Sequence, residues 1–151
     1  MLLTLHPSNF NKHFIMISDK APNNIIKNSF FYRLNYSDPA YTMNGIYIYF
    51  ELTGIKNEII YNKVKCSFDK TKNSKIIENL IKIEKEIITS FNHRENKKPI
   101  YHIKQHLTNG YFKIYNDKSF KNKFVLKISG YWTNDYEYGV TYKFFSVNNL
   151  L

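Results

Sequence analysis

Residues 74–92, SKIIENLIKIEKEIITSFN, carry the clearest helical periodicity in this sequence. The apolar residues recur mostly at steps of three and four, so they fall on one face of a helix. Asn73 or Ser74 can cap the start, and no glycine or proline interrupts the segment. The stretch therefore predicts one long amphipathic helix with its apolar face buried. The apolar positions are Ile76, Ile77, Leu80, Ile81, Ile83, Ile87, Ile88 and Phe91.

Most of the sequence on either side predicts strands, because it is rich in Ile, Tyr and Phe. Asn109-Gly110 lies between two apolar runs, which is a strong hairpin signal. Residues 93–99 form a polar linker after the helix. The expected strands are Phe10–Ser18, Phe30–Tyr36, Gly45–Leu52, Glu58–Phe68, Ile100–Leu107, Gly110–Tyr115, Lys123–Trp132 and Tyr138–Val147.

The order of these elements predicts one domain spanning residues 1–151. Several strands come first, one long helix follows, and several strands complete the chain. We expect a mainly β fold with one long helix (α+β), arranged as an OB-like barrel with added strands. A β-sandwich with a side helix is the alternative.

Positive charge is concentrated in the middle of the chain. Residues 56–127 hold 17 Lys and Arg against 7 Asp and Glu, which equals the net charge of +10 for the whole chain. Aromatic residues are interleaved with these cations, a pattern that suits single-stranded nucleic acid. Composition offers a competing explanation, because Ile, Asn, Lys, Tyr and Phe are all encoded by A/T-rich codons. That explanation accounts less well for the concentration of charge in one stretch.

Strand alternation separates a Lys/Tyr face from an apolar face on several strands. Val64, Cys66, Phe112 and Leu126 belong to the apolar set. Lys and Tyr side by side on a sheet can neutralise phosphates and stack bases, whereas a merely solvated sheet face would look much the same. The expected nucleic-acid-binding residues are Tyr47, Tyr49, Tyr61, Lys63, Lys65, Lys113, Tyr115, Lys127 and Lys143, with Tyr131 and Tyr142 as further stacking residues.

The C-terminal hairpin carries a further pattern, FVLKISGYW at residues 124–132 followed by YGVTYKF at 138–144. It resembles a terminal hairpin of small OB-fold single-stranded DNA-binding proteins of large DNA viruses. The resemblance covers about a sixth of the chain and implies coating of single strands during viral genome replication. The matching residues are Lys127, Ile128, Ser129, Gly130, Trp132, Gly139, Thr141, Tyr142, Lys143 and Phe144.

Catalytic and metal-binding patterns are sparse. The sequence contains no P-loop, no dinucleotide-binding turn and no Gly-x-Ser-x-Gly elbow. His102 and His106 would share one face of a helix, but their segment fits a strand equally well and has no third ligand nearby. Cys66 is the only cysteine, so we expect it to fill a core position in an intracellular, reducing compartment. We expect no enzyme activity, no metal and no cofactor.

These observations predict a soluble, non-enzymatic protein that binds single-stranded nucleic acid with little sequence preference, DNA rather than RNA. Lys outnumbers Arg 20 to 2, and Lys discriminates bases poorly. We expect no membrane partner, leave homo-oligomerisation open, and place the protein in the host cytoplasm or nucleus if it is viral. The alternatives are a virion component or accessory factor that binds another protein, and a small nuclease.

Overall fold

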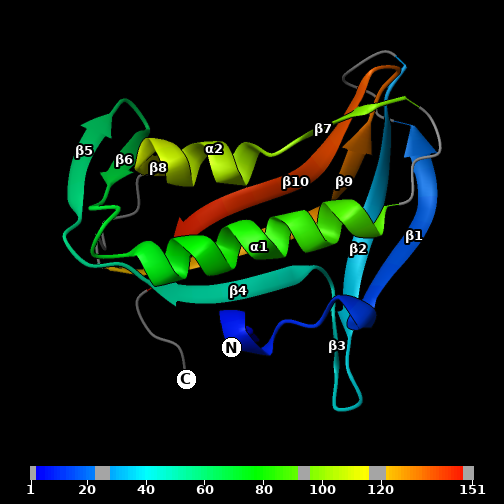
Figure 1. Ribbon diagram of the computed structural model, residues 1–151, viewed down its shortest axis with the longest axis horizontal. Coiled ribbons are helices and arrows are strands. Elements are labelled where there is room, and N and C mark those ends of the chain that lie inside the picture. The colour runs from blue at the N-terminus through cyan, green and yellow to red at the C-terminus, as the bar shows by residue number, and fades with distance from the viewer. Residues whose placement is uncertain (1–2, 23–27, 92–95, 116–121, 148–151) are drawn as a thin grey trace.

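The computed structural model describes residues 3–22, 28–91, 96–115 and 122–147, and the elements within those ranges are shown in Figure 1. Two short 3-10 turns, Pro7–Asn9 and Lys12–Phe14, precede the first strand. The helices are α1 (Ser74–Ser90) and α2 (His102–Asn109). The strands are β1 (Ile15–Pro22), β2 (Phe30–Ser37), β3 (Thr42–Met43), β4 (Ile46–Glu51), β5 (Lys56–Ile60), β6 (Lys63–Ser67), β7 (Lys98–Ile100), β8 (Tyr111–Tyr115), β9 (Lys123–Thr133) and β10 (Glu137–Ser146).

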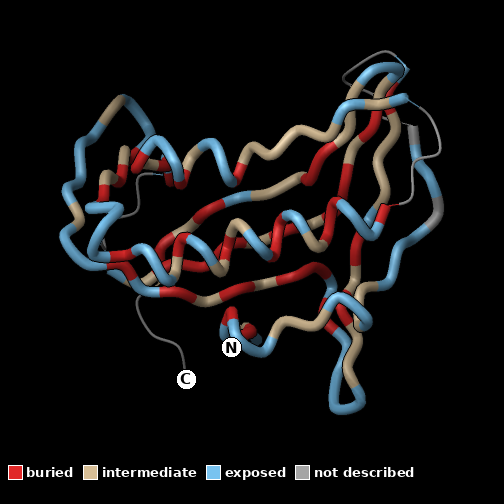
Figure 2. The backbone as a smooth tube through the Cα atoms, viewed as in Figure 1, coloured by how far each residue is buried: buried red, intermediate tan, exposed pale blue. Residues whose placement is uncertain are grey.

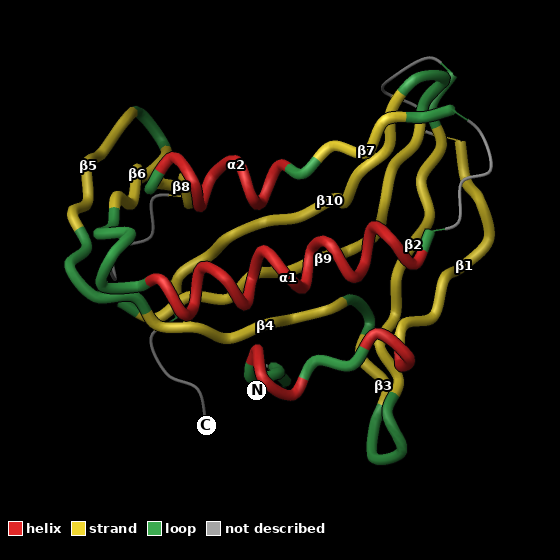
Figure 3. Tube along the Cα trace, viewed as in Figure 1, coloured by secondary structure: helices red, strands yellow, loops and turns green. Residues whose placement is uncertain are grey.

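The strands form two sheets, and Figure 3 shows where they lie relative to the helices. The larger sheet has the order β1-β2-β9-β10-β7, with β3 added to β2 and β4 added to β9. The smaller sheet has the order β5-β6-β8. The expectation of a mainly β fold with a long helix is confirmed. Both sheets are open among the described residues, so the expected OB-like barrel is not confirmed.

Helix α1 lies along the larger sheet, in front of β9 and between β4 and β10 in Figure 1. The apolar part of its buried face is the predicted one, because Ile77, Leu80, Ile83, Ile87 and Ile88 belong to the main hydrophobic cluster. Glu84 is also buried there, which the apolar spacing does not predict. Alternate residues of β4 and β9 complete that cluster from the sheet side, and the resulting band of buried positions is visible in Figure 2. The amphipathic pattern of residues 74–90 therefore determines which face of the sheet becomes core.

Strand β9 changes partner halfway along its length. Residues 123–128 pair with β4, whereas residues 130–133 pair with β2. The register with β10 shifts at the same point, which leaves Ser129 as the extra residue of a bulge. Gly130 follows, and a Cβ added there would collide with the Tyr32 carbonyl oxygen and come within 2.5 Å of the Phe31 ring. The bulge and the missing side chain together allow β9 to pair with β4 along one half of its length and with β2 along the other.

The bulge also reverses which side chains face the core. Phe124, Leu126 and Ile128 point inward as alternation predicts, but beyond the bulge Tyr131 is the buried residue and Trp132 is half-exposed. Tyr131 is only 6% exposed, and its ring stacks on Phe91 with centroids 3.7 Å apart. The prediction of Tyr131 as a surface stacking residue is therefore wrong.

Three other expectations from the sequence require correction. The expected strand Ile100–Leu107 is mostly helix α2, and Gly110 ends that helix with φ of +83° instead of forming a hairpin turn. The expected strand Glu58–Phe68 is a hairpin, in which β5 and β6 are joined at Tyr61 with φ of +57°. The strand expected from Phe10 begins only at Ile15, because a 3-10 turn precedes it.

Replacing Gly130 by alanine tests the close approach between β9 and β2. The new methyl group must displace the backbone of β2, so we expect the free energy of unfolding to fall by about 1–3 kcal/mol. Urea denaturation of the variant and of the wild type measures the change. Ser129→Ala is the control, because its hydroxyl makes only a 3.4 Å hydrogen bond to the Thr141 carbonyl. Equal losses from the two substitutions would contradict the proposed steric constraint.

Candidate nucleic-acid interface

Three adjacent strands of the larger sheet place Tyr47, Lys127 and Lys143 in one row. Tyr47 of β4 is directly opposite Lys127 of β9, which is directly opposite Lys143 of β10. Their chain neighbours Ile46, Ile48, Leu126 and Ile128 are buried, so the row lies on the face opposite the α1 core. Residues far apart in the sequence therefore form a continuous strip of aromatic and cationic groups.

The smaller sheet continues this strip. Lys63 of β6 is opposite Tyr115 of β8, and Lys65 is opposite Lys113. The Lys143 ammonium group lies 4.7 Å from the centre of the Tyr115 ring, which joins the two sheets. Each ring in the strip has a cation beside it, with Lys127 Nζ 5.4 Å from the Tyr47 ring centre and Lys63 Nζ 5.8 Å from the Tyr115 ring centre.

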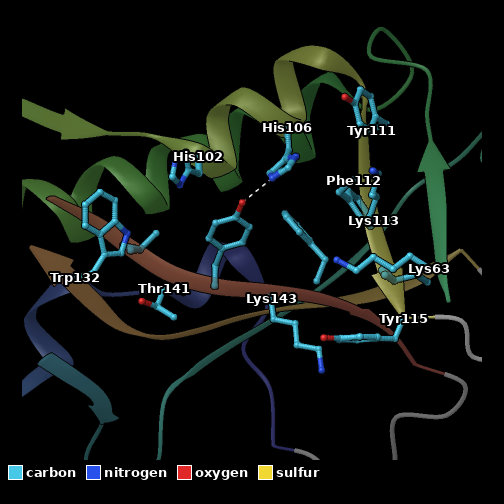
Figure 4. Close-up of a pocket in the computed structure, with 14 residues that line it drawn as sticks. Lys63, His102, His106, Tyr111, Phe112, Lys113, Tyr115, Trp132, Thr141 and Lys143 are labelled. Atoms are coloured by element: carbon cyan, nitrogen blue, oxygen red, sulfur yellow. Dashed lines mark hydrogen bonds between the residues drawn. The ribbon is translucent and has the colours of Figure 1, made fainter. Parts of the chain in front are cut away.

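Two hollows lie along the strip and share Ile114, Tyr115 and Lys143; together they are called the groove here. The first measures about 660 Å³ and lies between α2, β8 and β10, as the close-up in Figure 4 shows. The second measures about 350 Å³ and includes Tyr47 and Lys127. Neither hollow is lined by a described Asp or Glu, so the charge of the described lining is uniformly positive.

The structure brings together seven of the eleven residues that the sequence predicted for binding, since all seven line the groove. They are Tyr47, Lys63, Lys113, Tyr115, Lys127, Tyr142 and Lys143. Their roles in binding stay predictions.

Four of the predicted residues do not line the groove. Lys65 is nearby on the same face, with its Nζ 4.3 Å from the Tyr111 ring centre. Tyr49 donates a hydrogen bond to Glu51, and burial is the main cause that raises its pKa to about 12. Tyr61 is 95% exposed at the β5–β6 turn, and Tyr131 is in the core.

Sequence reasoning missed the contribution of α2, which places His102 and His106 over the first hollow. His106 Nε2 lies 2.6 Å from the hydroxyl oxygen of Tyr142, the contact drawn as a dashed line in Figure 4. Burial, and secondarily His102, lowers the pKa of His106; burial, and secondarily Glu84, raises that of Tyr142. Both groups are therefore neutral near pH 7. The four-residue spacing of His102 and His106 is the sequence signal for this helix, although the segment fits a strand equally well by sequence.

Glu84 explains why this segment is a helix. Its side chain is fully buried on α1, and its two carboxyl oxygens accept hydrogen bonds from the backbone N–H groups of Ile103 and Lys104, each at 2.9 Å. These donors lie in the first turn of α2, where no helical carbonyl can accept them. Tyr101 at the N-cap makes no side-chain capping bond, so Glu84 supplies that function from another helix.

Other chemistry in the described part of the chain is limited. No three His, Cys, Asp or Glu residues there are grouped closely enough to hold a metal ion. Burial raises the pKa of the Cys66 thiol to about 11, which disfavours the reactive thiolate. None of the described helices is long and apolar enough to cross a membrane.

Truncating Glu84 tests its role in holding α2. Glu84→Ala leaves two N–H groups without acceptors, so we expect the free energy of unfolding to fall by about 2–5 kcal/mol in urea denaturation. Glu86→Ala, on the same helix, removes only a 4.0 Å ion pair with Lys82 and is expected to cost about 0.5 kcal/mol or less. Similar losses from both variants would contradict the capping role.

The pH dependence of stability gives a second test of Glu84. Burial is the main cause that raises its pKa above the ordinary value of 4.5, although the N–H groups of Ile103 and Lys104 oppose the shift. The folded protein therefore holds this proton more tightly than the unfolded chain does. Its contribution to stability is complete below the ordinary pKa and is lost as the pH rises through the folded-state pKa. Urea midpoints of the wild type and of Glu84→Gln are measured between pH 4 and pH 8. The midpoint of the wild type should fall relative to that of the variant as the pH rises. A difference between the two midpoints that stays constant with pH would contradict the expected shift.

The comparisons with known proteins yield no relative. No family model matches the chain, and neither a curated protein nor a solved structure matches it.

Proposed function

We propose that this protein binds single-stranded nucleic acid along the groove, without catalysis and with little sequence preference. The observation that carries the proposal is the row of interleaved Lys and Tyr across two sheets, from Tyr47 through the adjacent Lys127 and Lys143 to Tyr115 and Lys63. The cations can neutralise phosphates, and the exposed rings can stack with unpaired bases. No described acidic side chain lines the groove to oppose a polyanion.

The Lys–Tyr contacts of the free protein do not prevent base stacking. A cation over a ring at an exposed site contributes about 0.5–1 kcal/mol, whereas a stacked base contributes about 1–3 kcal/mol. A base can therefore displace the ammonium group from Tyr115 or Tyr47, and the released Lys side chain is then free to meet a phosphate. Binding exchanges a weaker internal contact for two stronger external ones.

Single strands fit this surface better than duplexes. In a duplex the base faces are already stacked, so the rings of Tyr47 and Tyr115 would have no partner. The groove cations are all Lys, which meets phosphates as a point charge and reads base edges poorly. This composition favours weak sequence preference, and we propose DNA as the natural ligand.

The resemblance of the C-terminal hairpin supports the same function. Its Lys127, Tyr142 and Lys143 line the groove, whereas Gly130 permits the bend of β9. An OB-like relationship and a role in viral genome replication remain part of the proposal. OB folds also bind strands on an open face of β-strands, and that mode does not depend on closure of the sheet here.

A protein-binding role is the second candidate, and one observation favours it. Beyond Gly139, β10 pairs only with β9 among the described strands, so its other edge can accept an added strand from a partner.

Titration of labelled single-stranded and double-stranded oligonucleotides at two salt concentrations separates the two roles. Single-strand binding that weakens with salt supports our proposal, and absence of binding at low salt supports the second candidate.

Neutralising two groove lysines tests the electrostatic part of the proposal. Lys127→Gln combined with Lys143→Gln should weaken single-strand binding by about tenfold at moderate salt. The slope of log K against log salt should also decrease by about 1.4, since each lost contact accounts for about 0.7. Fluorescence anisotropy measures both quantities. Lys75→Gln combined with Lys85→Gln, on the exposed face of α1, removes the same charge and should have little effect. Equal effects would show that only net charge matters.

Two tyrosine substitutions distinguish the groove from general aromatic content. Tyr115→Ala should weaken single-strand binding by about 1–3 kcal/mol, because a stacking surface is lost. Tyr61→Ala should leave affinity unchanged, although Tyr61 is 95% exposed and was also predicted from the sequence. Anisotropy titrations with the same oligonucleotide measure both variants. Greater loss at Tyr61 than at Tyr115 would move the binding surface away from the groove.

A further inference from the structure

We propose that the part of the groove beneath α2 is a pocket for one unstacked nucleobase of the bound strand. This inference rests on the proposed function, because the lysines that follow the strand bring a base to the pocket. The pocket is formed by His102, His106, Trp132 and Tyr142, all of which line the first hollow. In this part of the groove a base would meet aromatic rings together with the polar groups of His106 and Tyr142.

Trp132 and His102 form two walls of the pocket. Their ring centres are 6.3 Å apart and their planes differ by 26°, and Figure 4 shows both rings at the same end of the hollow. A flat base between two rings needs about 7 Å, twice the contact distance of about 3.5 Å between carbon atoms. His102 is half-buried, so a rotation of its ring away from Trp132 would widen the space between the two rings.

The bulge in β9 is the reason that Trp132 is available for this role. It turns Tyr131 into the core and Trp132 outward, opposite Gly139 of β10. A Cβ at position 139 would lie 3.1 Å from the indole ring, so the absence of a side chain there gives the indole its place. The exposed part of Trp132 is therefore held by the backbone instead of being a mobile surface side chain.

The polar groups in the pocket suit a neutral ligand. His106 Nε2 and the Tyr142 hydroxyl oxygen are 2.6 Å apart, and the directions of their pKa shifts keep both uncharged near pH 7. A neutral imidazole and a phenol each combine a donor with an acceptor, as the edges of nucleobases do. A phosphate would instead prefer a cation, so this end of the hollow favours the base.

Cations line the other end of the same hollow. Lys63, Lys113 and Lys143 border it, and Figure 4 shows them on the side away from Trp132. The hollow therefore has an aromatic, neutral end and a cationic end. The two ends match the two chemical parts of a nucleotide, which are its base and its phosphate. An acidic peptide would satisfy the lysines but not the stacking walls.

Trp132 provides the test, because it is the only tryptophan in the chain. Its fluorescence is measured while the protein is titrated with a short oligothymidylate, and again with an abasic oligomer of equal length and charge. We expect saturable quenching by the strand with bases. The abasic strand should bind, as anisotropy measures, with little quenching. Thymidine monophosphate should quench at higher concentration, whereas ribose 5-phosphate should not.

A matched pair of variants localises the effect. His102→Ala should weaken binding of thymidine monophosphate by about tenfold, because one stacking wall is lost. Gln105→Ala, at an exposed position on the same helix, should leave this binding unchanged. Unchanged urea midpoints for both variants separate loss of the pocket from loss of the fold.

The outcomes distinguish the pocket from the wider proposal. Strand binding without any change in Trp132 fluorescence overturns the pocket and leaves the proposed function intact. Equal quenching by the abasic oligomer or by polyglutamate also overturns the pocket, because bases would then be unnecessary. If no strand binds, the proposed function fails, and the thymidine monophosphate titration alone decides whether the pocket exists.

Discussion

The contact between Glu84 and the first turn of α2 is the constraint on which the groove depends. A carboxyl group buried on α1 would normally be unfavourable, and here two backbone N–H groups compensate for its burial. The contact determines the position of α2 relative to α1. It thereby holds His106 within hydrogen-bonding distance of Tyr142 on β10. A polar interaction inside the protein thus shapes a surface on the opposite side of α2.

The sequence pattern predicted the structure well where residues close together in the chain determine it. The helix at residues 74–90 follows from apolar spacing alone, and alternation placed Lys63, Lys113, Lys127 and Lys143 on the side away from the core. Pattern failed where a distant residue decides the outcome. Residues 102–109 fit a helix and a strand equally well by sequence, and in the structure Glu84 of another helix accepts the N–H groups of their first turn. No residue within that segment indicates the contact with Glu84.

The bulge at Ser129 shows a second limit of sequence reasoning. Alternation assumes an unbroken strand, and one inserted residue exchanges the faces for everything that follows. Tyr131 and Trp132 therefore have roles opposite to those expected from the residues before them. The sequence gives no sign that β9 changes partner from β4 to β2, which is the change that requires a glycine at position 130.

The strand register has an energetic consequence for the unliganded protein. Lys127 is directly opposite Lys143, and Lys65 is directly opposite Lys113. Like charges at such positions repel one another and lower the stability of a sheet. A polyanion bound along these lysines, as proposed, would remove this repulsion, so the fold would gain stability on binding. The sheet in isolation is therefore mildly frustrated, and the proposed ligand would relieve that repulsion.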